Sequence, residues 1–293
     1  MNPDYRAVPS IATLHETRTT TTSPLLVGDI IHILNQQVYQ ALIIQDQKML
    51  ARLVGKQLVA GAQALAVNLG PGKEMGRLTP WVVSTIREQT GAPLFFSAGI
   101  LRHRKVLQNF GPGIVINAVT ANHADLARAL SLAAEYGSAL VVLLAGAGRE
   151  KASIDDRIQL AGEVLDQALV HGLPFSRLYL DPVLTWRPDP AAWHLSRGLP
   201  DIGSAVETLT LIKQLEGGVK TIVALGNGSE GMTRVQRCGS RCRMLPLLTE
   251  AGLDAVLLNC LDPEVMRVAG SIQRGGTLYC GAAPGRQQVP PAV

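Results

Sequence analysis

Residues 113–120, GIVINAVT, and residues 139–146, ALVVLLAG, are two nearly continuous aliphatic runs separated by a segment with helical spacing. In that segment Leu126, Leu130 and Ala133 recur every three or four residues, which indicates one buried face of a helix. A strand that is apolar at almost every position is typical of a parallel sheet covered on both faces. The stretch therefore predicts a strand, a helix and a second parallel strand.

The same unit repeats along the chain after Pro24. Eight strands that alternate with eight helices over about 250 residues predict a (β/α)8 TIM barrel, which is an α/β fold. The alternative, a doubly wound open sheet, would need a GxGxxG fingerprint after the first strand, and the sequence has none there. The six further aliphatic runs lie at residues 25–34, 64–70, 93–99, 178–183, 221–227 and 255–262.

Capping residues mark the ends of the predicted helices. Asp125 and Asp155 stand where helices are expected to begin, because a carboxylate interacts favourably with the positive end of the helix dipole. A second apolar stripe, Leu50, Leu53, Val54, Gln57 and Leu58, predicts another buried helix face. Glycines stand where helices are expected to end, at Gly61, Gly137, Gly172 and Gly252.

The composition favours a single barrel domain. Of the 293 residues, 47% are hydrophobic, which is enough to form a sizeable core. Only 17% are charged, which is too few for a disordered chain. We expect the barrel at residues 25–276, between a flexible extension at 1–24 and a flexible tail at 277–293. No run approaches the ~20 apolar residues of a membrane-spanning helix, and the N-terminus lacks the apolar core of a secretory signal. These features predict a cytoplasmic protein that does not enter a membrane.

Charge and cysteine content exclude further classes. The net charge of +4 is mild, and no block of basic residues marks a nucleic-acid-binding tail. The densest basic stretch, residues 234–243, is interpreted either as a solvated loop or as a surface that attracts an anionic ligand or partner. The four cysteines are too scattered for a disulfide framework, and Cys238 and Cys242 lack the second Cys or His pair of a zinc site. No bound metal is expected.

Polar residues stand at the carboxyl ends of the predicted strands, where TIM barrels place their active sites. A buried amide or carboxyl group without hydrogen-bond partners costs ~1–3 kcal/mol, so several such groups on one rim favour a ligand site. The residues are Asn68 after the second strand, Asn117 in the fourth, Asp181 in the sixth, Asn227 and Ser229 after the seventh, and Asn259 and Asp262 in the eighth.

This set is rich in amides and poor in nucleophiles. No serine or cysteine stands beside a histidine in a nucleophile elbow, and no strand ends in the lysine of a Schiff-base aldolase. Asp181 has no carboxylate partner for glycoside cleavage. An Asp with several Asn suits a flat heterocycle, because a carboxylate accepts two N–H bonds from an amino-pyrimidinone edge while Asn serves a carbonyl and a ring nitrogen.

From about Leu26 to about Ala269 the chain resembles the pterin-binding methyltransferases. These include the methyltetrahydrofolate:corrinoid protein methyltransferases, and dihydropteroate synthase is a more distant relative. The synthase itself is disfavoured, because its strand-seven Ser-Arg-Lys motif is Gly-Asn-Gly-Ser in this chain. Five segments carry the resemblance in the family's order: GAQALAVNLGPG at 61–72, IVINAVTA at 114–121, LVHGLPFSRLYLDPVL at 169–184, VALGNGS at 223–229 and EAGLDAVLLNC at 250–260.

The resemblance implies a methyltransferase that acts as a homodimer, with tetrahydrofolate or methyltetrahydrofolate as substrate. The methyl group would pass between the pterin and the cobalt of a corrinoid (cobalamin) carried by a partner protein. Asn117 and Asp181 would hold the pterin edge, and Asn227 would be the catalytic residue near N5, where a hydrogen bond that strengthens as the methyl group leaves favours the transition state. Asn68, Ser97, His32 and Ser229 are the remaining candidate substrate-binding residues.

Three positions depart from the family pattern. Ala66 stands where the strand-two motif has an Asp, and the loss of one carboxylate costs ~2–4 kcal/mol of binding. Strand three ends in residues 97–100, Ser-Ala-Gly-Ile, where the family often has Asp. His32 replaces an Asn and is interpreted as a general acid, a ligand contact or a satisfied barrel histidine. The alternatives to this methyltransferase are a barrel for a different methyl carrier and a non-catalytic partner of the corrinoid protein.

Trp186 and Trp193 lie in a long segment after the sixth strand. At the active face such a segment serves as a lid or as a docking surface for the corrinoid protein. A surface loop fixed by its prolines, with the tryptophans packed within it, is the alternative.

Overall fold

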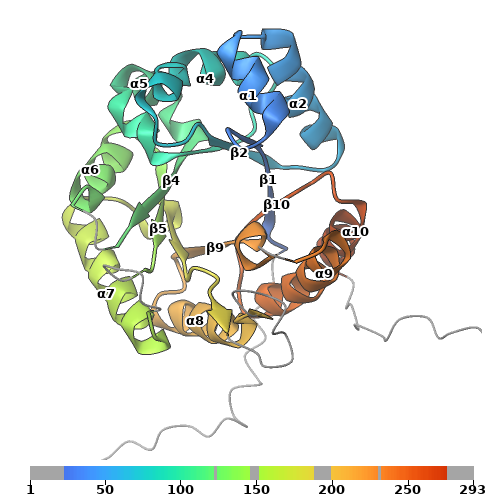
Figure 1. Cartoon of the computed structure of the whole chain (residues 1–293). Helices are drawn as coiled ribbons and strands as arrows, with labels where there is room; N and C mark the ends of the chain where they lie inside the picture. Colours follow the sequence, from blue (N-terminus) through green and yellow to red (C-terminus); the bar gives the residue numbers. More distant parts are fainter. Residues whose placement is uncertain (1–22, 122–123, 146–151, 188–198, 230–231, 276–293) are drawn as a thin grey trace, which may run out of the picture.

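The computed structural model of the chain describes residues 23–121, 124–145, 152–187, 199–229 and 232–275. Eight parallel strands close into a barrel, and helices surround it (Figure 1). The TIM barrel expected from the sequence is therefore confirmed. In barrel order the strands are β1 (Leu25–His32), β10 (Ala255–Leu258), β9 (Lys220–Ala224), β6 (Leu178–Asp181), β5 (Ala139–Leu143), β4 (Ile114–Thr120), β3 (Leu94–Phe96) and β2 (Ala64–Asn68).

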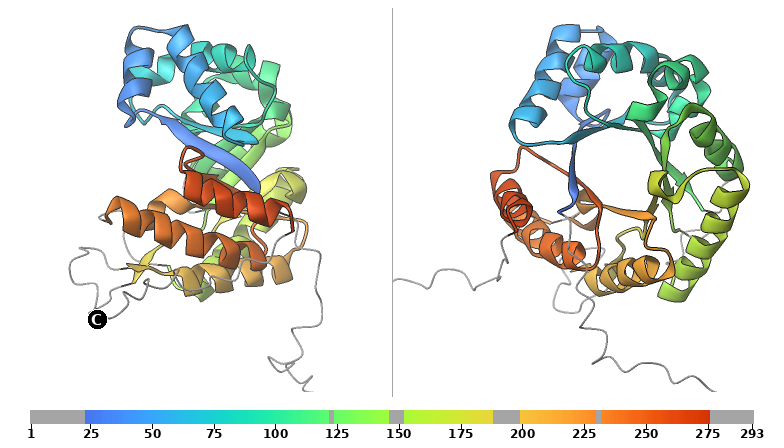
Figure 2. Two further views of the ribbon diagram at one scale, coloured as in Figure 1. Left: turned by 90° about the vertical axis from the view of Figure 1, so that its right-hand side faces the viewer. Right: turned by 180° about the vertical axis from the view of Figure 1, so that it is seen from behind.

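The helices form the outer layer and follow the strands in chain order, as the two further views show (Figure 2). In the described part of the chain no helix is long and apolar enough to cross a membrane. The helices are α1 (Gln36–Ile43), α2 (Gln47–Val59), α3 (Lys73–Arg77), α4 (Thr79–Arg87), α5 (Arg104–Phe110), α6 (Leu126–Tyr136), α7 (Ile154–Val170), α8 (Ile202–Leu215), α9 (Arg234–Glu250) and α10 (Pro263–Gln273).

Three connections contain short elements that bear on the site. The segment after β6 forms a small antiparallel pair, β7 (Trp186–Arg187) and β8 (Leu199–Pro200). Single-turn 3-10 helices follow β3 and β9, at η2 (Ala98–Arg102) and η6 (Leu225–Ser229). Both 3-10 helices therefore lie at the carboxyl ends of barrel strands.

The helix boundaries agree with the capping signals in the sequence. Asp125 is the N-cap residue of α6, and Asp155 lies in the first turn of α7, which begins with a capping box of Ser153 and Asp156. The interpretation of residues 234–243 as a loop is wrong, because this stretch forms the first part of α9. Thr233 and Gln236 form the capping box that starts this helix. The four glycines expected at helix ends, Gly61, Gly137, Gly172 and Gly252, all have positive φ.

Two apolar layers hold the barrel together. One lies between the strands and the helices. The other is a cluster with members from every barrel strand and none from a helix, which identifies it as the barrel interior. Within it the Phe95 and Tyr179 rings meet edge to face across the barrel, with centroids 5.7 Å apart. The interior cluster is Val27, Ala64, Ala66, Phe95, Val115, Val141, Tyr179, Ile222 and Ala255.

A bulge in β1 shapes the strand end that leads into the candidate site. The register with β2 shifts between Gly28 and Ile31, so the ladder is interrupted there. Gln57 of α2 is fully buried, and its Oε1 accepts a hydrogen bond from the Ile30 N–H at 3.2 Å. A Cβ at position 28 would lie 2.5 Å from that Oε1, which explains the glycine. The helix side chain thus stabilises the bulge.

Candidate functional site

A cavity of about 1380 Å³ opens at the carboxyl ends of the barrel strands. This volume exceeds the roughly 300–1,000 Å³ of ordinary small-molecule sites. Phe95 lines it, and the Phe95 ring contacts Tyr179 in the barrel interior below. Five of the substrate-binding residues expected from the sequence line this one cavity: His32, Asn68, Ser97, Asn117 and Asn227.

Strand alternation explains why three of these side chains share the cavity. Side chains at i and i+2 of a strand lie on the same face. Asn68 lies two residues after Ala66, Ser97 two residues after Phe95, and Asn117 two residues after Val115. Ala66, Phe95 and Val115 all belong to the barrel interior. Asn68 and Ser97 therefore stand at the carboxyl ends of β2 and β3, whereas β4 continues past Asn117 to Thr120.

Asn68 is fixed by a local hydrogen bond. Its Oδ1 accepts from the Gly70 N–H at 2.9 Å, and Gly70 has a φ of +70°. Because this turn occupies the amide oxygen, the Nδ2 group is the part of Asn68 that can donate to a ligand.

Asp29 is a cavity residue that sequence reasoning missed. It lines the cavity, and its Oδ2 lies 3.8 Å from the position a Cβ would take on Gly226, which precedes Asn227. Burial raises the pKa of Asp29, and the positive charges of Arg241 and His32 oppose that rise. The signal was present in the sequence: Asp29 follows the inward-facing Val27 by two residues within an aliphatic strand.

Ala66 lies inside the barrel and lines the cavity, so β2 contributes a methyl group at this position. The adjacent strand is β1, where Gly28 pairs with Leu65. Asp29 and Ala66 are therefore neighbours across the β1–β2 ladder. The carboxylate on that side of the cavity therefore comes from Asp29 of β1.

Asp181 lies at the end of β6 and is not among the residues that line the cavity. Asp181 lies at the same height along the barrel as the cavity. Thr120 of β4, which lines the cavity, pairs with Leu143 of β5, and Leu143 in turn pairs with Asp181 of β6. Its Oδ1 accepts a hydrogen bond from the Val183 N–H at 2.7 Å. Burial raises the pKa of Asp181 to about 7, while the Val183 hydrogen bond and the charge of Arg157 oppose the rise.

The turn at Asp181 is held in an uncommon conformation. Val183 has a φ of +57°, which a β-branched residue rarely adopts. The buried Arg157 of α7 lies behind it and donates to Ser204 Oγ at 2.8 Å and to Thr185 Oγ1 at 3.4 Å. Arg157 thereby ties α7, α8 and the segment after β6 together, which keeps this turn in place.

The remaining predicted residues fall on the connections after β6 and β9. Asn227 is exposed, lies in η6 and lines the cavity. The backbone of Ser229 belongs to η6, but its side chain lies outside what the structure describes. The same holds for the side chain of Trp186 in β7, and Trp193 falls in the undescribed residues 188–198.

Cysteine chemistry and metal binding find no support at the site. Burial raises the pKa of Cys260 to about 12, and the negative charge of Asp29 adds to the rise, so this sulfur is a thiol at neutral pH. Burial and the neighbouring Cys238 likewise raise the pKa of Cys242 to about 12. Within the described ranges no three His, Cys, Asp or Glu side chains group so that they could hold a metal ion.

Fold and cavity together define a TIM barrel with a polar, solvent-open site at the carboxyl ends of its strands. No family model matches the sequence. The fold is similar to dihydropteroate synthase from Xanthomonas albilineans with 4-aminobenzoic acid (17% identity, TM-score 0.63, 88% of this chain and 94% of that chain). It is also similar to Yersinia pestis DHPS with a pterine-sulfa conjugate (13% identity, TM-score 0.60, 87% of this chain and 95% of that chain). A third similar structure is the dihydropteroate synthase of Thermus thermophilus (18% identity, TM-score 0.58, 88% of this chain and 95% of that chain). At these identities the similarity shows the fold.

Proposed function

We propose that this protein is a pterin-binding enzyme that moves a methyl group between a tetrahydrofolate-type pterin and the cobalt of a corrinoid protein. The observation that carries the proposal is the cavity, where amide side chains from two strands, β2 and β4, and from η6 line one open mouth. Barrels of the same fold bind pterin compounds, as in the Yersinia pestis complex. The sequence resemblance supports the methyltransferase branch and a homodimer.

Ring recognition falls to side chains near the cavity floor. Asn117 can donate to the ring carbonyl and accept from a ring N–H, because an amide offers both groups. A carboxylate accepts two N–H bonds from the amino-pyrimidinone edge. Asp29 lies in the cavity and Asp181 lies level with it, so these two residues are the candidate carboxylates in the proposal. His32 and Ser97 complete the polar wall.

Asn227 is the proposed catalytic residue. A hydrogen bond from its amide to N5 strengthens as the methyl group leaves and negative charge develops on that nitrogen, which favours the transition state. The corrinoid of the partner protein supplies the cobalt that takes up the methyl group. The open mouth admits such a partner, since Asn227 and the 90% exposed Leu34 both line it.

Calorimetric titration with methyltetrahydrofolate tests pterin binding, and transfer to reduced cobalamin, followed by its absorbance, tests the reaction. We expect micromolar binding, loss of affinity in Asn117→Ala, and loss of kcat in Asn227→Ala with binding retained. Asn109→Ala is the matched control, because Asn109 is exposed on α5 and does not line the cavity. Absence of binding at millimolar ligand would reject the pterin assignment.

A second candidate is favoured by Ala66, which removes the family carboxylate from β2. In that case the barrel uses a different methyl carrier, or it serves the corrinoid protein without turnover. Methyltetrahydrofolate would then fail to bind, while the purified protein would still form a complex with a corrinoid protein in sedimentation.

A further inference from the structure

Positive charge gathers on one side of the cavity. Among its described lining residues four are permanently cationic: Lys73 and Arg77 of α3, Arg102 of η2 and Arg128 of α6. These elements follow β2, β3 and β4, which are neighbours in the barrel. On the opposite side, the described residues of β9 and η6 that line the cavity are Ala224, Gly226 and Asn227, and none of these three is charged.

One of these cations contacts the backbone of η2 next to the position of another. Arg128 donates from Nη2 to the Leu101 carbonyl at 3.4 Å, and Leu101 directly precedes Arg102. Both guanidinium groups are on exposed residues that line the mouth. Arg77 has one counter-ion, Glu74, in an exposed pair with 3.3 Å between Nη1 and Oε1. Asp125 and His103 are the other ionisable groups on this side.

The charge on this side does not serve the proposed ring chemistry. A neutral pterin ring needs amides and a carboxylate, which lie at the strand ends, whereas the four cations lie further out on the connections. The cavity is also larger than a bicyclic ring requires. Four cations against the carboxylates of Glu74 and Asp125 leave this side with an excess of positive charge, which attracts anions.

We propose that the connections after β2, β3 and β4 form a subsite for an anionic tail of the substrate, with Arg102 and Arg128 at its centre. The inference rests on the proposed function for the position of the ring. Guanidinium groups bind carboxylates and phosphates through paired N–H donors. The chain of glutamyl carboxylates on a folate is the anion that this subsite takes, and a phosphate ester on the pterin is the other source of the same chemistry.

The test compares the binding of four ligands by calorimetry: a tail-less tetrahydropterin, methyltetrahydrofolate with one glutamate, the same compound with four glutamates, and a pterin phosphate ester. We expect the tetraglutamate to bind about tenfold more tightly than the tail-less pterin, with the gain falling as salt rises, since exposed ion pairs contribute modestly and are screened. If the phosphate ester gains affinity and the tetraglutamate does not, the subsite binds phosphate, and its assignment to the glutamyl tail is overturned.

Variants separate this subsite from the ring site. Arg102→Ala/Arg128→Ala should remove most of the tail-dependent gain and change tail-less binding by less than about twofold, because the ring contacts are untouched. Arg102→Lys/Arg128→Lys should retain much of the gain. Arg52→Ala/Lys56→Ala is the control for net charge, since both residues lie on α2 and do not line the cavity.

Two results would overturn the inference. One is equal affinity for the tail-less and tetraglutamyl ligands, and the other is an equal loss for both in the Arg102→Ala/Arg128→Ala variant. If no pterin binds, the proposed function fails, and a tetraglutamate peptide alone then tests the subsite. Peptide binding that disappears in the double alanine variant would support it, and absence of peptide binding would reject it.

Discussion

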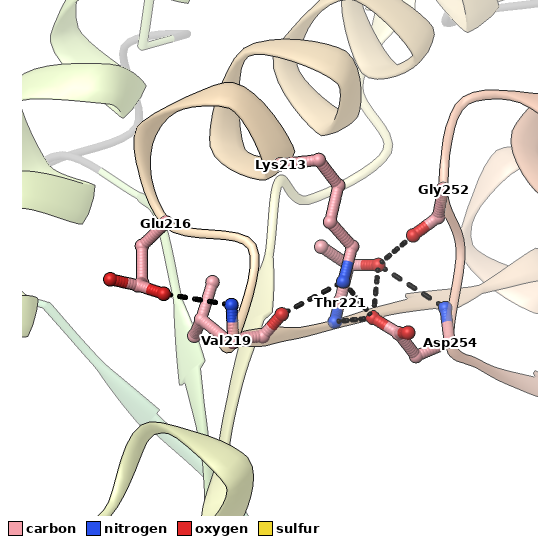
Figure 3. A network of polar contacts seen from close by, with 7 residues as sticks. Lys213, Glu216, Val219, Thr221, Gly252 and Asp254 are labelled. Atoms are coloured by element: carbon pink, nitrogen blue, oxygen red, sulfur yellow. Dashed lines mark hydrogen bonds and ion pairs between the residues drawn. The ribbon is translucent and has the colours of Figure 1, made fainter. Parts of the chain in front are cut away.

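Lys213 Nζ lies 2.6 Å from Asp254 Oδ2 at the amino-terminal ends of β9 and β10 (Figure 3). The same Nζ donates to the Val219 carbonyl at 2.8 Å, and the same Oδ2 accepts from the Thr221 N–H at 2.6 Å. Thr221 Oγ1 donates to the Gly252 carbonyl at 2.7 Å. One partly buried ion pair therefore links α8 and β9 to the turn before β10, at the end of the barrel opposite the cavity.

Removing Asp254 should destabilise the barrel and leave the site unchanged. Asp254→Ala removes the acceptor of both Lys213 and the Thr221 N–H, so we expect a loss of about 2–3 kcal/mol in the free energy of unfolding. Lys213→Met should cost less, because Asp254 keeps its bond from Thr221. Urea unfolding measures both, with ligand titration as the control. Equal costs for the two variants, or a change in ligand affinity, would contradict this account.

Asp181 should make stability depend on pH. The pKa of Asp181 is about 7 in the folded protein, whereas the ordinary value for an aspartate is 3.8. As pH rises, the carboxyl group therefore loses its proton in the unfolded chain before it does so in the folded protein. The folded state therefore loses stability between about pH 4 and 7, and the loss reaches about 4 kcal/mol above pH 7. Asp181→Asn keeps an acceptor for the Val183 N–H and removes this loss. In urea unfolding at pH 5, 6, 7 and 8, the free energy of unfolding of the wild type should fall relative to that of the variant as pH rises. Parallel plots of this free energy against pH would refute the prediction.

A side chain at position 28 should destabilise the protein, because it would clash with Gln57. A Cβ there would lie 2.5 Å from the Gln57 Oε1 that accepts from Ile30, so Gly28→Ala should cost about 1–3 kcal/mol. Because Gly28 adjoins Asp29, which lines the cavity, ligand affinity should fall as well. Gly55→Ala is the matched control, since a Cβ at that position meets no atom within 4 Å. If Gly28→Ala unfolds at the same urea concentration as this control, the proposed role of Gln57 is wrong.

Asp29 and Ala66 should behave as a coupled pair in pterin binding. Asp29→Asn should weaken binding about tenfold or more, because hydrogen bonds to charged groups contribute about 1.5–3 kcal/mol. Ala66→Asp alone should give no gain, since two carboxylates on adjacent strands repel each other. Ala66→Asp combined with Asp29→Asn should recover part of the affinity. A gain from Ala66→Asp in the wild-type background would show that Asp29 does not take the place of the missing carboxylate.

The residues that could be predicted from sequence are those whose position follows from local periodicity. Alternation puts Asn68, Ser97 and Asn117 two residues after apolar strand positions, and barrel closure then brings them to one mouth. Asp181 was identified by its place at a strand end, but its bond to the Val183 N–H and its separation from the cavity lining follow from a turn whose φ the sequence does not reveal.

The sequence by itself determined the eight barrel strands and most helix ends, because apolar period, capping residues and glycine act over a few neighbouring positions. Tertiary structure decided the rest. The Gln57 side chain stabilises the β1 bulge from a separate helix. Arg128 reaches the Leu101 carbonyl, next to Arg102, because neighbouring strands bring their connections together. These contacts join residues far apart in the chain, and only the closed barrel brings such residues within reach of one another.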